Sequence, residues 1–108
     1  MNSFHKNLSL RWNDFSLFEQ MANIGAEVGR AINWHKKNNK EMSKNAFYRA
    51  LELIDFSVDD PKNKNRLKEI LRMREVLVDY FNGDNIYQST GESLNKYFFY
   101  FNFVARNQ

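Results

Sequence analysis

Arg30 and His35 are the residues of this chain whose types and spacing could act together on a phosphate. Four residues separate them in the stretch GRAINWHKKNNK, residues 29–40. On a continuous helix, five positions correspond to about 140° around the axis. His35 then lies on the apolar side of the helix, and Arg30 lies on the solvated side. The two side chains therefore meet one phosphate only if the helix is broken there or a second subunit contributes.

The Arg-x4-His spacing of this stretch resembles the motif of the HEPN superfamily, helical bundles that often dimerise and cut RNA. The resemblance implies that Arg30 binds the scissile phosphate and that His35 acts as general acid or base. In that family the motif lies late in the bundle, whereas here it lies in the first long helix. The residues alone favour a different interpretation, in which His35 ends an apolar stripe near a helix C-terminus and Arg30 pairs with Glu27 at i,i+3.

Arg74 is a second candidate, because it lies in the middle of an apolar stripe. Its neighbours on the same face are Leu67, Ile70, Leu71, Leu77 and Val78. An arginine keeps its charge, so burying it requires a carboxylate or several carbonyl partners. We expect a buried ion pair with Asp55, or with Glu27 as the second choice. The alternative is a cleft in which Arg74 meets an anionic ligand such as a phosphate.

Several other chemistries lack the residues that they need. The chain has no cysteine and two histidines, which excludes disulfides and thiolate metal sites and leaves too few ligands for a His-based zinc site. No glycine-rich phosphate loop, Ser-His-Asp arrangement or Glu-x-x-His repeat is present. Gly25 and Gly29 instead predict a close approach of another helix. We therefore expect no metal and no cofactor, and a non-enzyme is favoured over an enzyme.

Four amphipathic helices are expected to position these residues. With four Gly and one Pro, the composition disfavours a turn-rich all-β fold. Capping signals and helical spacing of apolar residues predict helices over about 15–37, 43–58, 61–82 and 90–105, beginning at Ser16, Ser43, Asp60 and Ser89. Short connections make this an all-α, up-down-up-down four-helix bundle, a single domain over 1–108. Residues 1–13 form an N-terminal arm, which is either extended across the bundle or a short helical turn.

The segments FYRALELIDFSVDDPKNKNRLKEILRMREVLVDYF and STGES resemble those of small stand-alone prokaryotic helical-bundle proteins of unassigned function. That resemblance spans most of the chain and implies no activity. The start of the chain lacks the apolar core of a signal peptide, and no run approaches the ~20 apolar residues of a membrane span. A soluble cytoplasmic protein with no membrane partner is therefore expected.

Basic residues cluster at two helix junctions. Lys62, Lys64 and Arg66 open the third helix, where positive charge opposes the helix dipole. With Arg106 expected at the same end, they form a candidate anion site. The other cluster, Lys36, Lys37, Lys40 and Lys44, lies about 24 Å away for helices of ~16 residues. Because the clusters do not merge and the net charge is only +3, nucleic acid is not the favoured partner.

Phe99 and Phe103 in the stretch YFFYFNF point away from the core face of the last helix. A monomer would usually cover such a patch, and the cover is either the N-terminal arm or, preferably, a second copy of the chain. The leading hypothesis is a small interaction or adaptor protein that forms a homodimer through the fourth helix. The alternatives are a HEPN-like ribonuclease of the toxin or defence type and an RNA-associated binding subunit.

Overall fold

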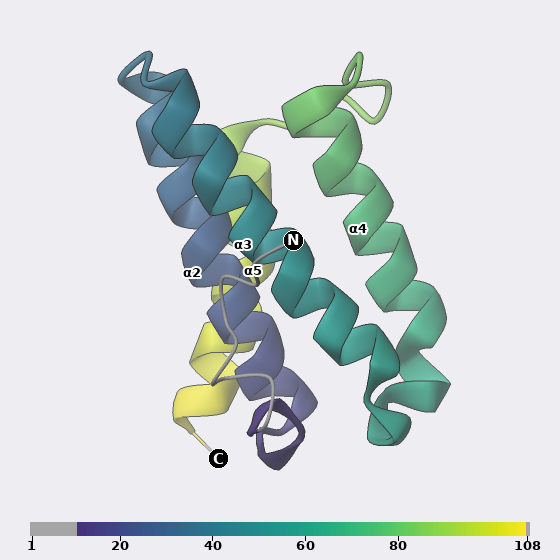
Figure 1. Cartoon of the computed structure of the whole chain (residues 1–108). Helices are drawn as coiled ribbons and strands as arrows, with labels where there is room; N and C mark the ends of the chain where they lie inside the picture. Colours follow the sequence, from purple (N-terminus) through teal and green to yellow (C-terminus); the bar gives the residue numbers. More distant parts are fainter. Residues whose placement is uncertain (1–10, 108) are drawn as a thin grey trace.

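The computed structural model describes residues 11–107 and is all-α, which confirms the fold class expected from the sequence (Figure 1). The α-helices run up, down, up and down, and they are α2 (Leu17–Lys36), α3 (Lys40–Asp59), α4 (Leu67–Asn82) and α5 (Gly91–Arg106). Two 3-10 segments, η1 (Trp12–Asp14) and η2 (Pro61–Arg66), precede α2 and α4. Residues 1–10 of the expected arm lie outside the described residues, and its described end is the helical turn η1.

The bundle is open along one side. Helix α2 packs against both α3 and α5, and α3 also packs against α4. Within residues 11–107, α4 and α5 make no contact of comparable extent, and Figure 1 shows α4 beside α3 at one side of the bundle. Because a helix buries only the sides that meet a neighbour, α4 and α5 keep apolar side chains along the open side.

The start of α3 differs from the prediction that Ser43 caps the second helix. The N-cap is Asn39, whose side chain accepts a hydrogen bond from the Met42 N–H at 3.1 Å. Asn38 has a φ of 59°, a left-handed conformation that asparagine tolerates, so a short turn joins α2 to α3. Ser43 is buried instead, and its hydroxyl donates to the Ala31 carbonyl of α2 at 2.8 Å.

The third helix, predicted as one segment over 61–82, is divided into η2 and α4. Asp60 caps this start as expected and accepts from the Lys62 N–H at 3.2 Å. Asn63 is drawn into the interior, where its Nδ2 donates to the Ser57 carbonyl at 2.9 Å. That inward bond accompanies the tighter 3-10 path of η2.

The cap of α5 is shifted by one residue from the prediction. Thr90 and Ser93 form the capping box, whereas the sequence suggested Ser89 and Glu92. The Asn85 side chain donates to the Ser89 carbonyl and accepts from the Ser89 N–H, both at 2.9 Å. Ser89 therefore belongs to the preceding loop.

Helices α2 and α5 approach each other closely at Gly25. A Cβ placed on Gly25 would lie 2.6 Å from the Phe98 Cβ. At Gly29 the nearest such atom is the Asn95 Oδ1, at an ordinary 3.8 Å. The close approach expected at both glycines is therefore found at Gly25 alone.

A buried polar cluster joins η1, α2, α3 and η2. The Gln20 Nε2 donates to the Trp12 carbonyl at 3.1 Å and to the Asp60 Oδ2 at 2.7 Å. The Asn63 Nδ2 donates to the Gln20 Oε1 at 2.8 Å, and the Trp12 indole N–H donates to the Ser57 hydroxyl at 3.0 Å. Gln20, Trp12 and Ser57 are fully buried. Since unpaired groups would be costly at such depth, this cluster holds one end of the bundle in a single arrangement.

Candidate functional site

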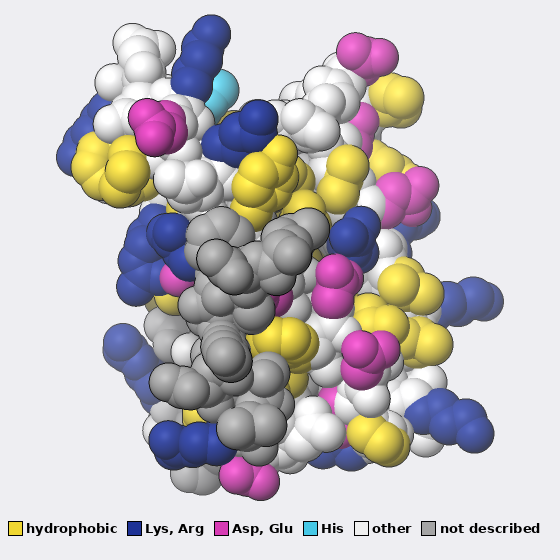
Figure 2. All heavy atoms as spheres, viewed as in Figure 1, with side chains coloured by type: hydrophobic (Ala, Val, Ile, Leu, Met, Phe, Trp, Pro, Cys, Tyr) yellow, Lys and Arg dark blue, Asp and Glu magenta, His cyan; other side chains and the backbone are white. Residues whose placement is uncertain are grey.

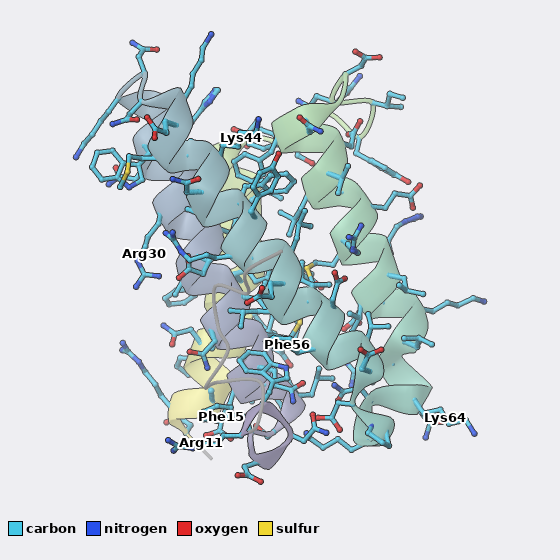
Figure 3. All side chains as sticks on the ribbon, viewed as in Figure 1. Arg11, Phe15, Arg30, Lys44, Phe56 and Lys64 are labelled. Carbon is cyan, nitrogen blue, oxygen red and sulfur yellow. The ribbon has the colours of Figure 1, made fainter. Side chains whose placement is uncertain are left out.

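Arg30 and His35 lie on one continuous helix, α2, and point in different directions. Arg30 is exposed, points away from the bundle (Figure 3), and donates to Glu27 at 2.8 Å, the i,i+3 pair expected from the sequence. His35 is also exposed, which contradicts its expected place at the end of the buried stripe. The last buried residue of α2 is Ile32, so the core does not reach His35 in the final turn. One chain therefore does not bring Arg30 and His35 together.

Glu27 connects α2 to α3 and is not a partner of Arg74. In addition to Arg30, it accepts a hydrogen bond from the Arg49 Nε of α3 at 2.8 Å. Its side chain is only 12% exposed. Arg49 was missed in the sequence because the packing of α2 against α3 decides which of many basic residues faces Glu27.

Arg74 forms an ion pair with Asp55, the partner that the sequence favoured. The Arg74 Nε donates to the Asp55 Oδ1 at 3.0 Å. The two side chains are 37% and 55% exposed, so the expectation of a buried pair is wrong. The apolar stripe of α4 is wider than its contact with α3, and Arg74 lies at the edge with the exposed Leu71. An exposed pair of this kind contributes about 0.2–1 kcal/mol to stability.

Lys62 is held by groups of its own chain. Its Nζ contacts the Asp60 carboxylate and donates to the Asn13 carbonyl at 3.1 Å. Burial acts to raise the pKa of Asp60, but hydrogen bonds from Lys62 and Gln20 and the charge of Lys62 outweigh it. The pKa of Asp60 is therefore lowered from its ordinary value, and the carboxylate stays charged.

The other basic residues at this end do not converge. Arg66 donates to Glu69 at 3.1 Å, whereas Lys64 extends into solvent (Figure 3). Arg106 ends α5, whose C-terminal end lies at the lower left in Figure 1, while η2 lies at the lower right. The candidate anion site at the start of the third helix is therefore not assembled as expected.

A cleft of about 340 Å³ lies between α4 and α5. Its buried lining is apolar and consists of Met73 and Leu77 from α4 and Leu94 and Phe98 from α5. The sequence did not indicate this cleft, because each of these residues is also an ordinary core residue. The cleft exists because α4 and α5 diverge, and helical periodicity carries no signal for that.

Tyr97 lines the same cleft beside polar residues. Burial raises the pKa of Tyr97 to about 12, with the charge of Glu69 acting in the same direction and that of Arg66 against it. The phenol is therefore neutral at physiological pH and can donate a hydrogen bond. Arg72 and Glu69 are exposed lining residues of opposite charge.

The outer face of α5 carries exposed aromatic side chains. Phe99 is 65% exposed and Phe103 is 58% exposed, so both lie at the surface as the sequence indicated. Tyr100 is exposed beside them. The core side of the same helix is filled by Leu94, Phe98 and Phe101. Helix α5 therefore presents apolar surface outward as well as inward.

Among residues 11–107, no three His, Asp or Glu side chains are placed to hold a metal ion. In the same part of the chain, no helix combines the length and the apolar character needed to cross a bilayer. Comparisons of the chain with protein-family models, with curated proteins and with solved structures found no match. The fold and its surfaces define an open helical bundle with an apolar cleft and an exposed aromatic helix face.

Proposed function

We propose that this protein is an interaction module, an adaptor that forms a homodimer through the outer face of α5 and holds an apolar helix of a partner protein in the α4–α5 cleft. The observation that carries the proposal is the apolar surface on both sides of α5. Phe99 and Phe103 extend outward, and the cleft lies on the side toward α4. Exposed apolar patches on a small protein commonly mark interaction sites.

The spacing of residues on α5 supports a symmetric dimer. Glu92, Phe99 and Arg106 are seven positions apart and therefore lie nearly in line along the helix. If the α5 helices of two copies cross antiparallel at Phe99, Glu92 of one copy faces Arg106 of the other. A two-fold axis forms this pair twice, and the aromatic side chains lie between the two pairs.

Sedimentation equilibrium tests the dimer. The wild-type protein is expected to be a dimer and the Phe99→Glu variant a monomer, because the charge would be buried in an apolar contact. Ile86→Glu is a matched control, since Ile86 is 78% exposed but lies outside α5. A wild-type monomer at every measured concentration, or a Phe99→Glu variant that still forms dimers, would refute this interface.

The α4–α5 cleft supports a helical partner. Apolar grooves between helices commonly receive the apolar side of an amphipathic helix. The floor of this cleft is apolar, and the Tyr97 hydroxyl is a neutral hydrogen-bond donor. Arg72 and Glu69 provide one positive and one negative charge that can pair with polar residues along the edge of a partner helix. We therefore expect the partner helix to carry a narrow apolar stripe with charged residues on either side.

Photo-crosslinking tests the cleft. A benzophenone amino acid at position 97 should give one discrete adduct with a partner protein in a cell extract. The same amino acid at position 42 is the control, because Tyr97 and Met42 are each 38% exposed but Met42 lies on α3. Equal adducts at both positions would argue against a specific site in the cleft.

A further inference from the structure

A second pocket, of about 280 Å³, lies at the end of the bundle where α2 ends and α3 begins. Its polar lining includes His35 from α2 and Lys40 and Lys44 from α3. Figure 2 shows the histidine beside basic side chains at this end, and Figure 3 shows Lys44 at the top of the space between α3 and α4. The pocket is separate from the α4–α5 cleft and shares none of its lining residues.

The lysines of this pocket belong, as Lys64 does, to the basic residues that have no carboxylate partner in the described part of the chain. Arg30, Arg49, Lys62, Arg66 and Arg74 each have a carboxylate partner. In the described part of the chain, no ion pair involves the three basic residues of the pocket. One of them, Lys40, also occupies the first position of α3, where positive charge opposes the helix dipole. An anion bound beside Lys40 would offset this unfavourable interaction with the dipole.

The other wall of the pocket is aromatic. The rings of Phe47 and Phe81 have centroids 5.0 Å apart, and those of Phe47 and Tyr48 are 5.8 Å apart. The Lys44 Nζ lies 5.6 Å from the centre of the Tyr48 ring, so charge and ring surface are adjacent. Tyr48 is partly exposed and can stack with a planar group that enters the pocket.

We propose that this pocket binds a phosphorylated planar molecule, with the chemistry of a nucleoside monophosphate. Lys40 and Lys44 bind the phosphate oxygens, His35 donates a further hydrogen bond, and the ring packs against Tyr48. The volume is at the lower end of small-molecule pockets and suits one such ligand rather than a longer chain. A free mononucleotide and the 5′-phosphorylated end of an RNA strand both present this chemistry.

The test is a calorimetric titration of the full chain with AMP, adenosine and inorganic phosphate. AMP should bind saturably and more tightly than either fragment. The Lys40→Gln/Lys44→Gln variant should bind AMP at least about tenfold more weakly, because it loses hydrogen bonds to a charged group. The control is Lys64→Gln/Lys68→Gln, which removes two exposed lysines and the same net charge elsewhere. It should bind AMP within about twofold of wild type, since distant surface charges are screened.

Three results would overturn the proposal: no saturable binding of AMP, AMP no tighter than inorganic phosphate, or equal weakening in the two double variants. Tyr48→Leu provides an independent measurement, because it should reduce the advantage of AMP over phosphate and leave phosphate binding unchanged. A 5′-phosphorylated trinucleotide that binds more tightly than AMP assigns the site to RNA ends, and equal binding assigns it to free nucleotides. Amide chemical shifts should change around Tyr48 and remain unchanged around Tyr97, which separates this site from the cleft.

Discussion

Replacing Gly25 by alanine should force α2 and α5 apart. The new Cβ would lie 2.6 Å from the Phe98 Cβ and 2.9 Å from its Cγ. These atoms are close to the backbone of α5, so the helix itself must move. Overpacking costs about 1–3 kcal/mol, and alanine regains about 1 kcal/mol through its helix propensity. Since a stiff contact belongs at the upper end of that range, we expect a net loss of about 2 kcal/mol in the free energy of unfolding.

Gly29→Ala, one turn further along α2, is the matched control. The nearest side-chain atom there is the Asn95 Oδ1 at 3.8 Å, an ordinary contact, so the variant should gain about 1 kcal/mol from helix propensity. Urea unfolding followed by far-UV circular dichroism should separate the two variants by about 3 kcal/mol, or about 1.5 M in midpoint for a slope of ~2 kcal/mol/M. If Gly25→Ala were as stable as Gly29→Ala, the packing of α5 against Gly25 would be refuted.

Four further measurements follow from the structure. Gln20→Leu should cost about 3 kcal/mol by leaving buried polar groups unpaired, whereas Asn23→Leu on the exposed side of α2 should change stability by less than about 0.5 kcal/mol in thermal unfolding. The pKa of Asp60 is lower in the folded protein than the unfolded pKa of about 3.9. Its contribution to the free energy of unfolding is therefore complete above about pH 3.9 and is lost as the pH falls toward the folded pKa. In urea unfolding, Asp60→Asn should therefore lose less stability than wild type as the pH falls through this window. Because the pKa of Tyr97 is raised to about 12 in the folded protein, its contribution to the free energy of unfolding is complete below pH ~10 and is lost as the pH rises toward about 12. Urea unfolding should therefore show a smaller loss of stability between these pH values for Tyr97→Phe than for wild type. Structured RNA should remain intact on gels with wild type and with His35→Ala, and cleavage by wild type alone would instead support the ribonuclease alternative.

Much of the fold could be predicted because its signals are local. The scarcity of Gly and Pro, the helical spacing of apolar residues and the Ser16–Glu19 capping box all act within a few turns of one helix. The errors at the start of α3 and in η2 come from groups that bond across helices. Ser43 reaches the Ala31 carbonyl of α2, and Asn63 reaches Gln20 and the Ser57 carbonyl. A capping residue and a buried polar residue cannot be told apart until the partner is known.

The candidate sites were less predictable than the helices. The Arg74–Asp55 pair could be predicted, because in an up-down bundle the two residues lie at the same level along neighbouring helices. The exposure of the pair to solvent could not be predicted. An apolar stripe shows which side of a helix can be buried, and it does not show how much of that side a neighbour covers. Lys40 and Lys44 stood out in the sequence as part of a basic cluster, but their shared pocket with His35 and Tyr48 depends on how α2, α3 and α4 pack.

The sequence by itself determined four amphipathic helices, their order, the aromatic outer face of α5 and the absence of cysteine chemistry. These properties depend on side-chain type and on the fixed geometry of the helix. The tertiary structure decided that Glu27 meets Arg49, that α4 stands apart from α5, and that His35 lies in a pocket with Lys40 and Lys44. Those outcomes depend on the distances between helices, which are set by contacts such as that between Gly25 and Phe98, far apart in the chain.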